Sequence, residues 1–526
     1  MKMVKSLILG SAAALVAVGG AQAADLPVKA KAVEYVKVCS LYGPGFYYIP
    51  GTDTCIKLGG YLRVDVLANT NNDAGGNMYG AGGANNRFTN GYTWRSREDL
   101  NLDTRTATEY GVVRTFFDAT FSWTSDNYSA NGAAPGTTIY NALGGGGTVA
   151  PGSVGANGGG GNIAYGGVGV YYAFIQFAGF TIGKAVSQFS TPWTNYPGNS
   201  SDMLVGGGGT VTGVNQFTYT AQFGNGVSLS LSAQDQTQYY QSGVNNLGAL
   251  GTASGTNGAS DYAGTIAPDL VAMLRVDQAW GLFQASFAAH DNHAAYYGAT
   301  EVTGHPDDKW GWAGQLALSI KNIPTGPGDT INVQGVYTNG ATRYNIQDLA
   351  ASSSAGAAVF SGTNVAGAYQ SVGFGFAPDS VFVTGGQQQL ITTYGMRGAY
   401  VHNWNPNWNT SIYGAWAAVS YNGTAKSYIC GPTGTGAGGS FGAAFGTAGL
   451  TSCNPDYQVA QIGTQTQWTP VKNLTFSADL TYMLLDQKYA GTITFPGSGS
   501  IGKPAAVYEL KDQGQVSLLL RAQRNW

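Results

Sequence analysis

Sixteen segments of this chain alternate between polar and apolar residues with a period of two, which is the pattern of strands with one apolar face. The spacers between these segments alternate between short and long, and Ala178-Gly179, Asn225-Gly226 and Trp280-Gly281 are typical of tight turns. The sequence therefore predicts antiparallel strands near 55–67, 91–104, 107–123, 164–178, 180–188, 213–223, 227–240, 268–279, 282–297, 309–321, 330–345, 388–402, 408–422, 456–468, 473–488 and 511–526.

The choice between a soluble and a membrane-spanning sheet rests on composition and spacer length. Only 10% of the residues are charged, against about 25% in a typical soluble domain. A β-sandwich would show the same alternation, but alternately short and long spacers are typical of outer-membrane barrels. The expected fold is all-β: a sixteen-stranded antiparallel transmembrane β-barrel over 55–526, with an aqueous lumen and an inward-folded third loop.

The first residues have the pattern of a secretory signal peptide. Lys2 and Lys5 precede an apolar stretch over 7–18, and Ala21-Gln22-Ala23 is a cleavage site of the A-x-A type. We therefore expect a signal peptide over 1–23 and an N-terminal periplasmic segment over 24–54. Removing the two lysines changes the formal net charge from −3 to −5, which argues against a nucleic-acid partner.

The phase of the alternation predicts which face of each strand meets lipid. In 55–67 an apolar face opposes Lys57, Tyr61, Arg63 and Asp65, and in 473–485 an apolar face opposes Thr475, Ser477, Asp479 and Thr481. The polar faces should line the lumen. The final strand ends in Trp526, which is expected in the periplasmic aromatic girdle.

Arginines are concentrated in the first third of the chain. Strand phase turns carboxylates such as Asp118 toward the lumen, together with five cations: Lys57, Arg63, Arg95, Arg97 and Arg114. Neighbouring strands lie about 4.8 Å apart, so these residues could form a basic wall that biases ion traffic. The alternative is a structural salt-bridge network with Asp65, Asp99, Asp103 and Asp118. Glu98 falls on the outer face, which suggests a protomer contact or a β-bulge.

The segment Ala185–Thr212 is the candidate for a loop that folds into the lumen and constricts it. Its aromatic and proline residues suit a compact, packed loop, and Asp202 is its only carboxylate. The alternative is an ordinary external loop. Together with the basic wall, this loop would complete the predicted pore constriction.

Cys39, Cys55, Cys430 and Cys453 make an even number of cysteines in an exported chain, which predicts disulfides. Three pairings are possible, and proximity in the sequence favours Cys39–Cys55 and Cys430–Cys453. His290, His293 and His305 are interpreted as solvated residues of one external loop rather than as metal ligands. No catalytic set and no cofactor motif can be singled out.

Two stretches resemble the general porins of alphaproteobacteria: the run from Cys39 to Tyr61, CSLYGPGFYYIPGTDTCIKLGGY, and the run from Asp103 to Gly111, DTRTATEYG. The resemblance implies a homotrimer of sixteen-stranded barrels, an inward third loop and passive diffusion. It also implies wall arginines at Arg95, Arg97 and Arg114.

The predicted function is that of an outer-membrane porin, a water-filled channel for small hydrophilic solutes and ions. Its expected partners are outer-membrane lipids and lipopolysaccharide, two further copies of the chain, and the permeating solutes. A substrate-selective channel for sugar or peptide stays open, because aromatic residues are abundant. An outer-membrane barrel enzyme is a weaker alternative, since it would need a catalytic set.

Overall fold

The computed structural model describes residues 37–68, 92–124, 167–193, 196–200, 204–208, 213–235, 240–249, 262–298, 300–346, 358–360, 370–495 and 505–526. The expected signal peptide over 1–23 lies outside the described residues, as does Asp202. The chain divides into two compact units, Met1–Ile56 and Lys57–Trp526. Each unit is described by itself.

The N-terminal unit is held by a disulfide. It contains the 3-10 helix η1 (Ser40–Tyr42) and the strand β1 (Tyr47–Tyr48), which pairs with the first residues of β2, Tyr48 opposite Cys55. Cys39 is bonded to Cys55 with 6.1 Å between their Cα atoms. Both cysteines and Phe46 are buried together. The pairing is the one that proximity in the sequence favours, and it closes a unit too short to have a large apolar core.

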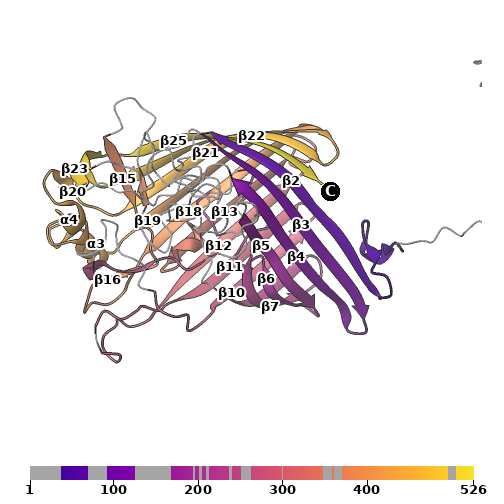
Figure 1. The fold of residues 1–526 in the computed structure, drawn as a ribbon, viewed down its shortest axis with the longest axis horizontal. Coiled ribbons are helices and arrows are strands. Elements are labelled where there is room, and N and C mark those ends of the chain that lie inside the picture. Colours follow the sequence, from indigo (N-terminus) through magenta and orange to yellow (C-terminus); the bar gives the residue numbers. More distant parts are fainter. Residues whose placement is uncertain are drawn as a thin grey trace, which may run out of the picture. The chain divides into compact units, whose positions relative to one another are not determined.

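The second unit is a closed antiparallel β-barrel (Figure 1). One sheet contains seventeen strands, of which β1 pairs only with β2, so the other sixteen form the ring. The ring closes where β25 pairs with β2, from Tyr61 opposite Asn525 to Ala68 opposite Leu518. The sixteen-stranded barrel is therefore confirmed. Its strands are β2 (Thr54–Ala68), β3 (Tyr92–Thr108), β4 (Gly111–Thr124), β5 (Gly167–Phe177), β6 (Phe180–Ala185), β7 (Val214–Gln222), β8 (Val227–Gln234), β10 (Asp269–Gln278), β11 (Gly281–Asn292), β12 (Lys309–Lys321), β13 (Thr330–Asn339), β18 (Thr392–Asn405), β19 (Trp408–Ser420), β21 (Tyr457–Val471), β22 (Leu474–Gln487) and β25 (Gln513–Asn525).

Short turns join the strands in pairs at one end of the barrel. Ala178 and Gly179 both have positive φ, at 49° and 85°, and so do Asn225 and Gly226, at 49° and 73°. Positive φ at both central residues is the requirement of the type I′ hairpin turn, whose twist matches that of the strands it joins. In outer-membrane barrels the end with short turns is periplasmic and the end with long loops is external.

The two faces of the barrel wall differ as the alternation predicts. Large apolar side chains are exposed on the outer face, for example Leu62, Leu316 and Leu480. Polar side chains such as Thr218, Gln284 and Thr481 are turned inward and buried. Because lipid would cover the outer face, apolar exposure there needs no protein partner.

Glu98 is a charged residue on the outer face of β3. It lies opposite Phe121, an exposed outer residue, and the ladder between β3 and β4 runs from Arg95 to Thr108 without a register shift. The bulge interpretation is therefore wrong for this ladder. Strand phase alone places Glu98 outside.

Long loops build a packed cap over the external end of the barrel, a feature that the sequence pattern of spacers did not predict. Figure 1 shows α3 and α4 gathered at this end. The cap contains α3 (Gly423–Cys430), α4 (Ser440–Phe445), β14 (Ala358–Phe360), β15 (Ser371–Gly375), β20 (Leu450–Ser452), β23 (Ala490–Phe495) and β24 (Ala506–Leu510). A separate three-stranded sheet is formed by β9 (Val244–Asn246), β16 (Ser380–Phe382) and β17 (Gln389–Leu390), and η2 (Leu247–Ala249) and η3 (Thr342–Tyr344) are single turns.

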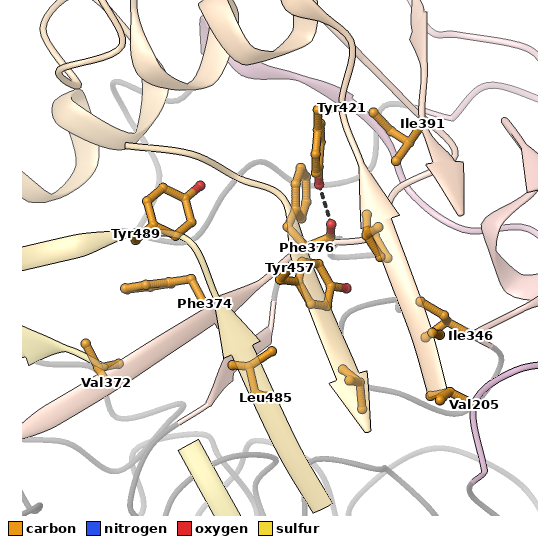
Figure 2. Close-up of a cluster of buried hydrophobic side chains, with 14 of the residues drawn as sticks. Val205, Ile346, Val372, Phe374, Phe376, Ile391, Tyr421, Tyr457, Leu485 and Tyr489 are labelled. Atoms are coloured by element: carbon orange, nitrogen blue, oxygen red, sulfur yellow. Dashed lines mark hydrogen bonds between the residues drawn. The ribbon is translucent and has the colours of Figure 1, made fainter. Parts of the chain in front are cut away.

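The core of this cap is aromatic (Figure 2). Phe374 of β15 packs against Phe441 and Phe445 of α4, with ring centroids 5.3 and 5.0 Å away. The Tyr421 hydroxyl donates to the Phe376 carbonyl. Cys430 is bonded to Cys453 within the same buried cluster, so the second disulfide braces a packed element. Within the described residues, no helix combines the length and the apolar character needed to cross a membrane.

Candidate functional site

The third long loop, residues 186–213 between β6 and β7, folds into the barrel. Its first part is held by inward-facing glutamines of the neighbouring strands. The Gln284 amide donates to the Ser190 carbonyl at 3.0 Å, and the Gln315 amide donates to the Phe189 carbonyl at 2.8 Å. Trp193 Nε1 donates to Gln334 Oε1 at 2.6 Å. These glutamines come from β11, β12 and β13, so the loop follows the inner wall.

The loop then reaches the far side of the lumen. The Ser200 backbone N–H donates to Asp479 Oδ2 of β22 at 2.6 Å. On the return path the Leu204 carbonyl accepts from Arg397 at 2.9 Å, and the Val205 N–H donates to Gln461 Oε1 at 2.9 Å. The inward third loop is therefore confirmed, and the alternative of an ordinary external loop is wrong.

An aromatic stack anchors the loop at its start. Phe189 is buried against Tyr344, with ring centroids 4.6 Å apart, and Tyr344 stacks on Tyr240 at 4.0 Å. Burial raises the pKa of Tyr240 to about 12 and that of Tyr344 well above its usual value. Both hydroxyls are therefore protonated, and Tyr344 donates to Asp269 Oδ2 at 2.5 Å.

His290 lies beside this stack. The expectation that its side chain is solvated is wrong. Its side chain is completely buried, with Nδ1 2.8 Å from Asp269 Oδ1 and Nε2 3.4 Å from Asp379 Oδ2. A buried polar side chain needs such partners because it has lost water. His293 is only partly exposed and contacts Asp308 at 2.7 Å. Across the described ranges, no group of three or more His, Cys, Asp or Glu is placed to hold a metal ion.

Between the third loop and the wall of β3, β4 and β10 lies a cavity of about 650 Å³, the eyelet cavity. Three arginines line it, Arg63, Arg97 and Arg275, together with two carboxylates, Asp99 and Asp118. The loop contributes the opposite side through uncharged residues: Val186, Ser187, Gln188, Thr191, Pro192 and Tyr196. Among the described residues that line this cavity, arginines thus outnumber carboxylates by one.

Each of the lining arginines donates to at least one neutral partner. Arg97 donates to Ser122 Oγ and to Tyr171 OH, both at 2.8 Å. Arg275 donates through Nη2 to Gln284 Oε1 at 2.7 Å. Arg63 donates to Gln523 Oε1 at 2.8 Å and lies over the Tyr61 ring. Hydroxyl and amide partners orient a guanidinium group without neutralising its charge.

The other predicted wall residues lie elsewhere. Arg95 is buried, with its Nη2 2.5 Å from Asp65 Oδ2. Arg114 contacts Asp103 at 3.0 Å, and Arg105 contacts the same carboxylate at 2.9 Å. Lys57 is exposed on β2. The described residues that line the eyelet cavity do not include Arg95, Arg114 or Lys57. Arg95 and Arg114 lie in ion pairs.

Arg275 is the lining residue that sequence reasoning missed. It shares its strand face with Val271 and Met273, which are buried inside the barrel, whereas Leu270 and Leu274 are exposed outside. The inner face of β10 is apolar only at Val271 and Met273, since Asp269, Arg275 and Asp277 lie on the same face. Strand phase could therefore have placed Arg275 in the lumen.

The closed barrel, its apolar outer wall and its charged, loop-narrowed lumen define a transmembrane β-barrel of the outer-membrane type. Residues 25–519 match the sequence family described as a porin subfamily, and the chain belongs to that family. The resemblance to alphaproteobacterial porins is thereby confirmed.

Two relatives and one solved structure show how far the similarity extends. Porin Omp2b of Brucella suis biovar 1 is 35% identical over 292 residues, which cover 55% of this chain and 66% of that protein. Porin Omp2b of Brucella melitensis biotype 1 gives the same values. The chain thus spans slightly less than two thirds of these relatives. The outer membrane channel DcaP of Acinetobacter baumannii has a similar fold, with a TM-score of 0.54, 12% identity and coverage of 91% of this chain and 99% of that chain.

Proposed function

We propose that this chain forms a water-filled channel for passive diffusion of small hydrophilic solutes and ions across the outer membrane. The observation that carries the proposal is the eyelet cavity, where Arg63, Arg97 and Arg275 line a passage beside the inward loop. A polar, hydrated cavity inside a barrel passes solutes, and its excess positive charge favours anions. A channel role is supported over an enzymatic one by membership of the porin family.

We also infer that only some of the predicted wall residues form the constriction. Arg63, Arg97 and Asp118 line the eyelet cavity, and Arg275 and Asp99 join them. Three of the predicted wall residues then lie outside the constriction, namely Arg95, Arg114 and Lys57. The first two are members of ion pairs. The described residues of the third loop carry no charge, so Asp99 and Asp118 supply negative charge from the same wall as Arg97.

The test is the reversal potential of single channels in planar bilayers across a tenfold potassium chloride gradient. A charge about 4 Å from an ion interacts by about 1 kcal/mol in bulk water, and by more in a confined site. Since about 1.4 kcal/mol corresponds to a factor of ten, the double variant Arg97→Ser/Arg275→Ser should lower the anion-to-cation permeability ratio by up to about tenfold. The shift should shrink at 1 M salt, where the Debye length is about 3 Å.

The matched control is Arg105→Ser, which removes one cation outside the eyelet cavity and leaves Arg114 beside Asp103. Its reversal potential should equal that of the wild type. Equal reversal potentials for the wild type and the double variant at low salt would refute the assignment of the constriction. Conductance that saturates with one sugar or peptide would instead indicate the substrate-selective alternative.

The proposed assembly is a homotrimer embedded among outer-membrane lipids and lipopolysaccharide. Three like barrels would bury apolar wall against each other, and Glu98 on the outer face of β3 offers a polar contact there. Membership of the porin family supports this assembly.

A further inference from the structure

A second cavity of about 280 Å³, the side cavity, lies next to the eyelet cavity, and Arg63 and Tyr196 line both. It is enclosed between the tip of the third loop and the strands β2, β21, β22 and β25. Ser200 and Asn199 line it from the loop, and Ser477, Gln523 and Arg521 line it from the wall. The tip is held in place there because Ser200 N–H donates to Asp479 Oδ2.

The described residues that line the side cavity include two guanidinium groups and no carboxylate. Over the part of the chain that the structure describes, Arg63 makes no ion pair within 4 Å; its Nε donates to the Gln523 amide oxygen. Arg521 donates through Nε to Asp65 Oδ1 at 2.6 Å, but the same carboxylate also accepts from Arg95. Asp65 is therefore shared by two arginines, whereas the described residues that line the side cavity carry two positive charges.

The neutral lining groups complete a surface that can bind a negatively charged oxygen. Hydroxyls of Ser200, Ser477 and Thr475 and the side-chain amide of Gln467 surround the two guanidinium groups. Arg presents N–H groups in a planar fork that matches carboxylate and phosphate oxygens. Arg521 is only 11% exposed, and loss of competing water strengthens such contacts.

We propose that the side cavity is a binding site for a small oxyanion, held between Arg63 and Arg521 beside the permeation path. Its volume is below the range of about 300–1,000 Å³ that is usual for drug-sized ligands, so the ligand class is inorganic phosphate or a short dicarboxylate rather than a sugar. The proposal rests on the proposed function only in that the anion reaches the site through the lumen. An occupied site would add negative charge next to Arg63 and lower the anion preference of the channel.

The test is isothermal titration of the refolded protein in detergent at constant ionic strength. Sodium phosphate is titrated in one arm and sodium succinate in the other, each against sodium chloride. We expect saturable binding in at least one arm, and the tighter arm identifies the source of the oxyanion. Arg521→Gln should weaken it about tenfold, which corresponds to about 1.4 kcal/mol. Ser477→Asp places a carboxylate in the site and should abolish binding.

The comparator is Arg275→Gln, which removes the same charge from the eyelet cavity only and should change the affinity less than twofold. Circular dichroism and heat-dependent gel mobility verify that each variant is folded. Absence of saturable binding to the wild type in both arms, or equal weakening by Arg521→Gln and Arg275→Gln, would overturn the proposal. Chloride conductance is recorded on the same samples. Conductance without oxyanion binding would contradict only the proposed binding site. Oxyanion binding without conductance would contradict only the proposed function.

Discussion

Asp65 is a completely buried carboxylate that accepts hydrogen bonds from two arginines on neighbouring strands. Arg95 reaches Asp65 Oδ2 from β3, and Arg521 reaches Oδ1 from β25. The pairs therefore join the first, second and last strands of the ring, where the barrel closes. A buried ion pair adds little net stability when it is intact, but removing one partner leaves buried charge without compensation.

We predict that Asp65→Asn lowers the free energy of unfolding by about 3–5 kcal/mol, since two buried arginines lose their counter-charge. The measurement is urea unfolding of the barrel in lipid vesicles. The control is Asp277→Asn, which disrupts an exposed pair with Lys321 at 3.6 Å and should cost less than about 1 kcal/mol. Similar losses for the two variants would contradict a special role for the buried carboxylate.

The third loop is the element that narrows the lumen. Polar side chains on β11, β12, β13, β18, β21 and β22 bind its backbone, and this distribution fixes its path across the lumen. Its tip is held at Ser200 by Asp479, which also accepts from the Tyr413 hydroxyl. A hydrogen bond to a charged group contributes about 1.5–3 kcal/mol, so a single side chain can hold the tip.

Replacing Asp479 by Ala should release the tip and increase the current fluctuations of single channels. A loss of about 1.4 kcal/mol raises the population of displaced tips about tenfold, and mean conductance should rise with it. Asp486→Ala on the same strand is the control, because Asp486 contacts only the exposed Lys488 in the described hydrogen bonds. Current traces of Asp479→Ala that match the wild type would show that the tip is held by other contacts.

On the scale of the whole molecule, the barrel wall must be covered by lipid or by further copies of the chain. Its outer face carries large apolar residues around the ring, such as Phe117, Phe217, Leu316 and Ile462. Glu98 is the exception on this face of β3. A carboxylate that faces lipid is unfavourable, whereas one in a contact between copies can find a polar partner.

We predict that the purified protein is a trimer in mild detergent and that Glu98→Leu lowers the temperature at which the trimer dissociates. Light scattering gives the assembly, and gel mobility after heating gives the dissociation temperature. Leu316→Ala on β12, half the ring away from β3, should leave that temperature unchanged. If Glu98→Leu stabilises the barrel and the dissociation temperature does not fall, Glu98 faces lipid. A conducting monomer would refute the assembly.

The sequence by itself determined the barrel. Strand geometry turns successive side chains to opposite faces, so that apolar residues face lipid and polar residues face water. Strand number and the inward direction of Arg63, Arg97 and Asp118 followed from that local rule. Tertiary structure alone decided which cations line the eyelet cavity. Ser200 meets Asp479 across 279 residues of sequence, and Arg95 and Asp65 face the same lumen yet neutralise each other.

The burial of His290 and the aromatic cap were also decided by tertiary structure. Phe374, Phe441 and Tyr489 come from three separate loops, and their assembly leaves no period in the sequence. Side-chain direction is a local property of a strand and can be predicted from its alternation. Distances between segments remote in sequence depend on the packing of the whole chain, so they are known only once that packing is seen.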